Sequence, residues 1–291
     1  MSDTDRSFNA PRVAADLRES RARDERDFAH DDEVESGATL VVDPLLDPAS
    51  YSQAHRCRES RDGKLNPITT PISIWMDVTG SLRNLPVIFL SVLIGLFGKL
   101  ERRKSVPGPQ LSFNAIGDPV AESDFPGDQV PVQLAQYENS VPAALQLRSI
   151  VREGGGGPGM KEGYIYAFYA LARHTVLDSF EKRKRKGIAI FIGDETSHDR
   201  VIARIANRIF GDHIRNDILL ADIYAEAARM HDIYMIIPAQ AAHGSSTVVR
   251  GFWNQLLGED HVFVLNDAQK IDDLIVTIVE TNQRQSQGTQ Q

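Results

Sequence analysis

The chain has 291 residues, of which 42% are hydrophobic and 25% are charged, and its formal net charge is −8. These values are typical of a globular protein with one large domain or two small ones. A net charge of −8 argues against a general nucleic-acid binder, which would carry a basic surface, and is compatible with attracting a cation. Because Cys57 is the only cysteine, an intrachain disulfide and a cysteine-based zinc site are excluded, and we expect a reducing compartment, the cytoplasm.

The first 38 residues are dense in charges of both signs and poor in large apolar side chains. Such a segment cannot bury enough surface to offset its ordering entropy, so we expect 1–38 to be a disordered charged tail. Asn9 and Pro11 would allow a short solvated helix to about Arg26. The alternative is a docking arm that becomes ordered on a partner.

Two features of the sequence argue against secretion and against contact with a membrane. The start of the chain lacks the apolar core of a signal peptide. The most apolar run, 86–98, is shorter than the roughly 20 residues that span a bilayer, which favours a buried helix.

After the tail, apolar pieces in TLVVDPLLDP predict that 39–70 is a lead-in segment packing on the main domain. The main domain is expected over 71–282, and the polar run QRQSQGTQQ is expected to form a tail over 283–291.

Within the main domain, short apolar runs between turn signals predict strands, and longer periodic segments predict helices. The predicted strands are 72–76, 111–116, 130–136, 188–192, 233–237 and 261–265. The predicted helices are 86–100, 140–152, 161–180, 200–210, 217–230, 246–257 and 268–281. Strands that alternate with helices indicate an α/β fold with a doubly wound, mostly parallel sheet and helices on both faces.

Two of the predicted strands run directly into acidic residues. The first ends at Asp77, and the fourth leads into Asp194 and Glu195. Ligands in such sheets bind beyond the carboxyl ends of the strands, where the strand order reverses. Two carboxylates meeting there repel each other, and a cation relieves the repulsion. Thr79 and Ser81 add neutral oxygens from the same loop, so the donors suit a hard ion such as Mg²⁺ or Ca²⁺.

The segment DVTGS after an apolar strand resembles the Asp-x-Ser-x-Ser metal-ion-dependent adhesion site of von Willebrand factor A (VWA) domains. The resemblance implies that Asp77, Thr79 and Ser81 bind the metal and that Asp194, in FIGDET, completes the site directly or through water. The loop threonine that this family normally adds is absent from GGGGPGMKEGY, and Glu162 is the candidate to replace it.

The resemblance extends over about 55–282, and it is carried by RESRD, AIGD, EGGGG, FIGDE and WNQLLG as well as DVTGS. Together these segments look like an uncharacterised bacterial and phage group of VWA domains. The group implies a strand order 3-2-1-4-5-6 with an antiparallel third strand at the edge. It also implies a binding module whose Mg²⁺, or Ca²⁺ or Mn²⁺, takes an Asp or Glu from a partner protein. Related bacterial domains often act as adaptors beside AAA+ ATPases, so the resemblance implies such an ATPase as a partner.

A second resemblance leads to a different function. DVTGS is also similar to the nucleophile loop of phosphoaspartyl enzymes of the haloacid dehalogenase superfamily, and Asp194 with Asp199 is similar to their late metal motif. Asp77 would then attack a phosphoryl group with the help of Mg²⁺ and a lysine, for which Lys186 is the nearest candidate. A cap inserted after DVTGS would favour this enzyme, whereas a buried helix directly after it favours the binding module.

Two further segments carry weaker signals. The glycine loop 154–159 has no Gly-Lys-Ser/Thr ending, which argues against a phosphate-binding P-loop, and we expect it to bring backbone close to the metal rim. The basic run EKRKRKG, 181–187, predicts a solvated helix end, with a patch for an acidic partner as the alternative.

Overall fold

The computed structural model describes residues 28–49, 57–64, 66–120, 127–139, 141–155 and 159–288 of the chain. A six-stranded sheet forms its centre, in the spatial order β12-β11-β7-β2-β3-β4. These strands are β2 (Thr70–Asp77), β3 (Pro109–Ile116), β4 (Val132–Gln133), β7 (Gly187–Ile192), β11 (His231–Pro238) and β12 (Val262–Leu265). All neighbours are parallel except the edge pair β3 and β4, which is antiparallel. The order 3-2-1-4-5-6 with an antiparallel third strand, which the VWA resemblance implied, is confirmed.

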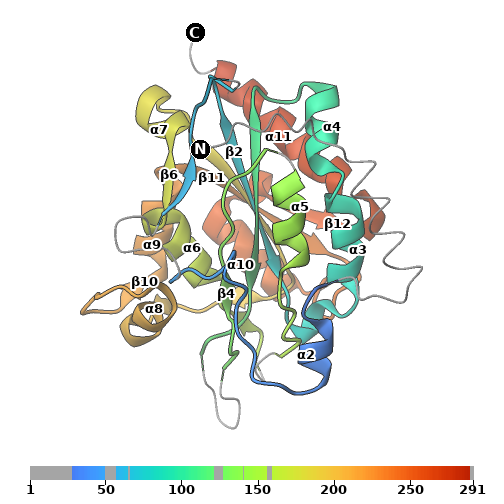
Figure 1. Cartoon of the computed structure of the whole chain (residues 1–291), viewed down its shortest axis with the longest axis vertical. Coiled ribbons are helices and arrows are strands. Elements are labelled where there is room, and N and C mark those ends of the chain that lie inside the picture. Colours follow the sequence, from blue (N-terminus) through green and yellow to red (C-terminus); the bar gives the residue numbers. More distant parts are fainter. Residues whose placement is uncertain are drawn as a thin grey trace.

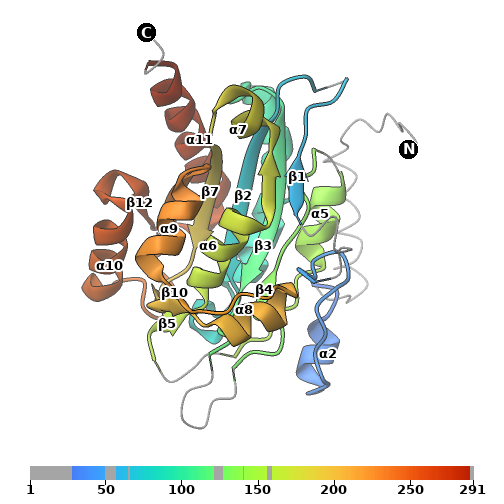
Figure 2. The ribbon, with the colours of Figure 1, turned by 90° about the vertical axis from the view of Figure 1, so that its left-hand side faces the viewer.

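Helices cover both faces of this sheet (Figure 1). One face packs against α3 (Leu85–Leu93), α4 (Leu96–Arg103), α5 (Val141–Arg148) and α11 (Ile271–Gly288). The other face packs against α6 (Tyr164–Arg173), α8 (Ala203–Phe210), α9 (Leu220–Ala228) and α10 (Thr247–Leu257), several of which lie in front of the strands in Figure 2. Alternate side chains of β2 point to opposite faces, so Ile74 and Met76 join the first core while Trp75 joins the second.

Smaller elements surround the sheet. They are α2 (Asp31–Glu35), β1 (Arg58–Ser60), η1 (Gly80–Leu82), β5 (Lys161–Glu162), β6 (Thr175–Leu177), α7 (Asp178–Arg183), β8 (Thr196–Ser197), β9 (Arg200–Val201), β10 (Ile218–Leu219), η2 (Glu259–His261) and η3 (Ala268–Lys270). The described part of the chain contains no helix that is long and apolar enough to cross a bilayer.

Several predicted helices are shorter than expected or divided. The predicted helix 161–180 is instead β5, α6, β6 and α7, because the β-branched pair Thr175 and Val176 forms β6 beside β1, a distant partner. Likewise, β9 pairs with β10 and delays the starts of α8 and α9. The predicted helix 86–100 is divided into α3 and α4, with Gly95 at the start of the second.

The third predicted strand, 130–136, is reduced to the two residues of β4, because the backbone groups that follow β4 form hydrogen bonds with the lead-in segment instead of with a neighbouring strand. The amide of Leu134 donates to the carbonyl of Leu46 at 2.7 Å, and the carbonyl of Leu134 accepts from Nε of the buried Arg58 at 2.7 Å. The lead-in therefore packs on the domain, as expected, by replacing part of a sheet edge.

The ends of the described chain also differ from the sequence-based expectation. Residues 28–38 carry the helix α2 instead of a disordered tail, and Phe28 is buried. The helix predicted between Asn9 and Arg26 lies outside the described residues. At the other end, α11 extends to Gly288, so most of the predicted polar tail 283–291 is helical.

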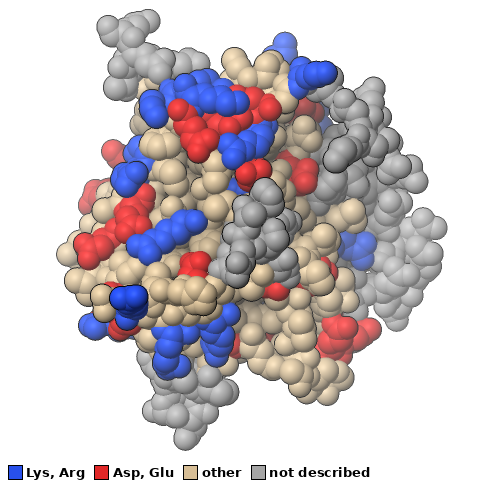
Figure 3. Space-filling model, turned by 60° about the vertical axis from the view of Figure 1, so that its left-hand side comes forward, with Lys and Arg blue, Asp and Glu red and all other residues tan. Residues whose placement is uncertain are grey.

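The basic run 181–187 forms the end of α7 and the turn after it, and its cations are paired within the fold. Lys182 contacts Asp178 at 2.6 Å, Arg183 contacts Asp62 at 2.6 Å, and Lys186 contacts Asp232 at 3.4 Å. In Figure 3, the Lys and Arg side chains (blue) around α7 lie among Asp and Glu side chains (red). This pairing agrees with the interpretation as a solvated helix end.

Candidate functional site

The register of the two central strands brings their acidic ends together. In the parallel pair β2 and β7, Met76 lies opposite Ile192. Asp77 therefore lies opposite Gly193, and Asp194 is the second residue after the end of β7. Both carboxylates are fully buried at the carboxyl edge of the sheet, at the lower end of the molecule in Figure 1.

Two hydroxyl groups connect these two acids. The Oγ1 atom of Thr79 donates to Oδ1 of Asp77 at 2.7 Å, and Oγ of Ser81 donates to Oδ1 of Asp194 at 2.6 Å. The two hydroxyl oxygens are 3.3 Å apart. Because each hydroxyl has one proton and directs it at a carboxylate, both oxygens present lone pairs to the space between them. Such a space favours a cation.

Tyr164, at the start of α6, completes the surroundings of Asp77. Its hydroxyl donates to Oδ2 of Asp77 at 2.7 Å, and its ring is fully buried. The contact requires glycine at position 193, because a Cβ there would lie 1.9 Å from the Tyr164 hydroxyl and 3.1 Å from Cβ of Asp77. The glycine of FIGDE is thus explained by the close approach of the tyrosine.

A second group of buried acids adjoins the first. Glu162 in β5 and Glu195 influence each other's protonation, and Oε2 of Glu162 has no hydrogen-bond partner in the described part of the chain. Asp118 accepts from Nε2 of His198 at 2.8 Å, and its amide donates to Oδ2 of Asp128 at 2.7 Å. All four carboxylates are buried.

Burial and mutual repulsion perturb these acids. Burial raises the pKa of Asp77 to about 6, against the hydrogen bonds from Thr79 and Tyr164, and the charge of Asp194 adds to the rise. Burial likewise raises the pKa of Glu195 to about 7. For Glu162, burial and the charge of Asp77 raise the pKa well above its ordinary value. The edge therefore carries more negative charge than its surroundings stabilise.

The described residues supply little positive charge against this group. His198 and His243 are the side chains that pair with it, the latter at 3.4 Å from Glu195, and no described lysine or arginine forms an ion pair with any of the six acids. These acids are Asp77, Asp118, Asp128, Glu162, Asp194 and Glu195.

The side chains fit a hard divalent cation. Carboxylate and hydroxyl oxygens are the ligands that Mg²⁺ and Ca²⁺ prefer, and the unpartnered Oε2 of Glu162 adds a buried acceptor. Among the described residues, no three His, Cys, Asp or Glu side chains converge as a complete metal cage. A cation here would accordingly depend on Thr79 and Ser81 as well as on the acids.

Two loops hold the DVTGS segment in place. The amide of Gly80 donates to the carbonyl of Gly155 at 2.7 Å, so the glycine loop does approach the rim as expected. After β11, the amide of His243 donates to Oδ2 of Asp194 at 2.6 Å, and the amide of Ala242 donates to the carbonyl of Ser81 at 3.0 Å. The site is thus assembled from segments far apart in the sequence.

The structure brings the residues that the sequence predicted for the site close to one another. The structure joins Asp77, Thr79, Ser81 and Asp194 through hydrogen bonds, and it places Glu162 within the electrostatic reach of Asp77. Sequence reasoning missed the roles of Tyr164, Asp118, Asp128 and His198. Asp118 had a signal, since it follows β3 in AIGD as Asp77 ends β2, whereas nothing local marks the other three.

The residues of the phosphotransfer interpretation do not gather here. Lys186 precedes β7 and pairs with Asp232, so it lies at the opposite end of the strand from Asp194. The carboxylate of Asp199 is 73% exposed and lies 3.6 Å from Arg200. The short helix η1 and then α3 directly follow Asp77, without a cap between β2 and β3.

No protein-family profile matches the sequence, and no curated protein was found to match it. The fold is similar to that of the pilus adhesin SpaC from Lactobacillus rhamnosus GG in its open conformation, at 9% identity and a TM-score of 0.48, over 77% of this chain and 31% of the adhesin. It is also similar to proximal thread matrix protein 1 from the mussel byssus, at 11% identity and a TM-score of 0.45, over 74% of this chain and 48% of that protein. The chain spans about a third to a half of these proteins, and the likeness concerns the fold alone.

The contact between Gly193 and Tyr164 predicts a coupled pair of substitutions. Gly193→Ala should destabilise the protein by about 1–3 kcal/mol because the new methyl group displaces the tyrosine hydroxyl. In a Tyr164→Phe background the same substitution should cost less, and urea denaturation of the four proteins measures the difference. Gly251→Ala, on α10 with no neighbour within 4 Å of its Cβ, is the control and should not destabilise. If the losses of stability in Gly193→Ala and Tyr164→Phe are simply additive in the double variant, the predicted interaction between the two positions is wrong.

The repulsion at the edge predicts the effect of neutralising Glu162. In the presence of a chelator, Glu162→Gln should raise the free energy of unfolding by about 1 kcal/mol, because it removes one buried carboxylate from a group of like charges. Glu181→Gln, at an exposed side chain on α7, should show no gain and serves as the control. A loss of stability in Glu162→Gln would contradict this prediction, because it would show that the folded protein stabilises the Glu162 carboxylate even without a cation.

Proposed function

We propose that this chain is a metal-dependent protein-binding module. In this proposal Asp77, Thr79 and Ser81 hold a divalent cation, Mg²⁺ or else Ca²⁺ or Mn²⁺, together with Asp194. The cation binds the carboxylate of an Asp or Glu on a partner protein. One observation carries the proposal: two hydroxyl oxygens 3.3 Å apart both direct their protons at buried carboxylates.

The physical argument begins with the orientation of those hydroxyls. The carboxylates accept the protons of Thr79 and Ser81, which leaves the lone pairs of the two hydroxyl oxygens available. Hydrogen-bond acceptors behind the ligands of a metal site orient those ligands in the same way. The cation, when bound, offsets the repulsion between acids from β2 and β7. Because few anionic ligands neutralise it, the cation retains its attraction for an incoming carboxylate.

Glu162 has a separate place in the proposal. It occupies the segment where the VWA family carries a threonine, and it lies within the electrostatic reach of Asp77. A glutamate there would add negative charge and bind the cation more tightly than a threonine would. It would also weaken the attraction of the cation for a partner carboxylate. In this proposal Glu162 therefore sets the balance between the affinity of the site for the cation and the affinity of the bound cation for the partner.

The partner class follows from the resemblance to VWA proteins that act beside AAA+ ATPases. We propose such an ATPase as the first partner to test, with an exposed Asp or Glu as its contact. Affinity capture with and without chelator addresses this point, and capture that is equal in both conditions argues against a metal-bridged contact.

Phosphotransfer is the competing function, and the positions of two residues weigh against it. Lys186 lies at the amino end of β7 and is engaged by Asp232, so it does not lie where a phosphoryl group on Asp77 would need a lysine. The helix α3 begins eight residues after Asp77, which leaves no room for a substrate-covering cap.

The metal proposal is tested by thermal denaturation with Mg²⁺ or Mn²⁺ and with chelator. Stabilisation of the wild-type protein by the ion should disappear in Asp77→Ala and Ser81→Ala, since a ligand that binds only the folded protein stabilises it by mass action. Ser91→Ala, which removes a hydroxyl on α3 away from the site, should retain it.

Full stabilisation in both site variants would overturn the ligand assignment. Hydrolysis of a generic phosphate ester with Mg²⁺ that is lost in Asp77→Asn would instead establish phosphotransfer as the function.

A further inference from the structure

A pocket of about 180 Å³ lies directly beside the DVTGS loop, between that loop and the helix α2. We refer to it as the α2 pocket. Thr79 forms part of one wall and Val34, from α2, forms part of the opposite wall. Because Thr79 is one of the two hydroxyl residues assigned to the cation, a partner bound at the cation would reach this pocket with a neighbouring side chain.

The wall supplied by α2 is fixed before any partner arrives. Asp31 accepts from the guanidinium of Arg152 at 2.7 and 3.2 Å, and Arg152 also stacks over the ring of the buried Phe28, 4.7 Å from its centroid. The amide of Ala29 donates to the carbonyl of Arg148 at 3.0 Å. A preformed wall of this kind lowers the ordering cost of binding.

The size of the pocket and the apolar part of its mixed lining point to an apolar side chain. A cavity of about 150 Å³ accepts a benzene molecule, so a pocket of about 180 Å³ accommodates a leucine or phenylalanine side chain. Val34, Val78 and Pro86 provide apolar surface. The charges of Asp31 and Arg152 neutralise each other, so they give little preference for a charged occupant.

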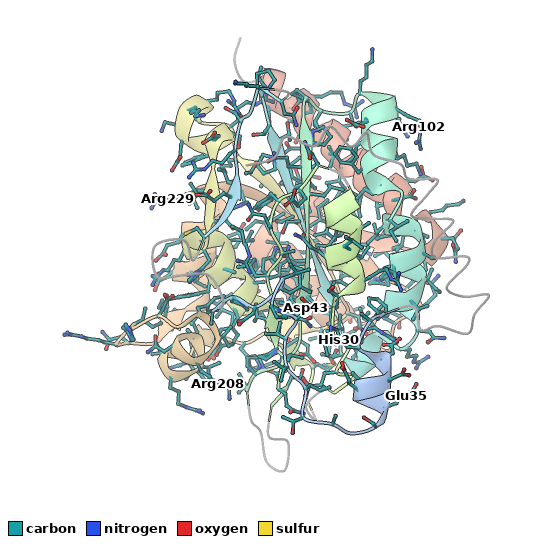
Figure 4. The ribbon with its side chains drawn as sticks, viewed as in Figure 1. His30, Glu35, Asp43, Arg102, Arg208 and Arg229 are labelled. Carbon is teal, nitrogen blue, oxygen red and sulfur yellow. The ribbon has the colours of Figure 1, made fainter. Side chains whose placement is uncertain are left out.

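One cation at the pocket is not neutralised in this way. Arg83, two residues after Ser81, lines the pocket, is exposed and forms no ion pair within the described part of the chain. Together with the proposed cation it makes this rim attractive to an acidic segment. Glu35, labelled on α2 at the lower end of the molecule in Figure 4, also lines this pocket.

We propose that the partner segment carries a large apolar residue next to the carboxylate that binds the cation, and that this residue occupies the α2 pocket. The recognised element is then an Asp or Glu adjoining a Phe or Leu. This inference rests on the proposed metal-dependent function and adds the second anchoring group, with Val34 as a residue that determines specificity.

The test uses the full chain and short blocked alanine peptides that contain one Asp. The residue next to the Asp, on one side or the other, is Phe, Ala or Glu. Binding is measured in Mn²⁺ and in chelator. Calorimetric titration should show that an Asp-Phe peptide binds in Mn²⁺ about tenfold or more tightly than its Asp-Ala counterpart, as expected for burial of one large apolar side chain. Replacing Asp by Asn, or adding chelator, should abolish binding.

Two substitutions assign the preference to the pocket. Val34→Trp should fill the α2 pocket and remove the preference for Phe, while Val34→Ala should weaken it in a chain whose fold is unchanged. Val248→Trp, at a side chain 61% exposed on α10, is the matched control and should keep the preference. All three variants should retain stabilisation by Mn²⁺, because none alters a proposed ligand.

The outcomes separate the two proposals. Equal, metal-dependent binding of Asp-Phe and Asp-Ala peptides, or a preference for Asp-Glu, would overturn the pocket assignment and leave the metal-dependent function intact. If Phe peptides bind equally well without the Asp and without Mn²⁺, the proposed coupling between the pocket and the cation is overturned. Absence of both Mn²⁺ stabilisation and peptide binding would overturn both proposals together.

Discussion

Repulsion between buried carboxylates is the interaction that sets apart the carboxyl edge of the central sheet in this protein. Six acids lie buried around the ends of β2, β3 and β7 with two histidines paired to them, and burial raises the pKa of Asp77, Glu162 and Glu195. Folding places like charges in a poorly solvated space, which is costly unless protons, hydroxyl groups or a cation offset it. The hydroxyls of Thr79 and Ser81 offset part of this cost and leave their oxygens available to a cation.

The rest of the architecture serves to hold that edge in place. The parallel register of β2 and β7 sets Asp77 beside Gly193, and the absence of a side chain at Gly193 admits the hydroxyl of Tyr164. The glycine loop accepts a backbone hydrogen bond from Gly80 of the DVTGS segment, and the loop after β11 donates backbone hydrogen bonds to Ser81 and to Asp194. Because these contacts come from both sides of the sheet, the positions of the acids are determined by the packing of the whole domain.

The segment before the domain takes part in the same arrangement. The helix α2 is anchored through Asp31 and Phe28 to Arg152, which lies just before the glycines that contact Gly80. The segment 28–38 therefore forms one side of the surface around the proposed cation. Its charged composition alone gave no sign of this, because the anchoring side chains are few and their partners lie more than a hundred residues away.

The alternation of short apolar runs with longer periodic segments determined the fold class, and the acids that follow strands located the site, since hydrophobic periodicity and strand ends are local properties. The division of 161–180 into two helices and two short strands depended on tertiary pairing, as did the shortening of β4. Tyr164, Asp128 and His198 became part of the site only through packing, because no pattern in their own segments distinguishes a side chain that reaches a distant carboxylate from one that fills a core.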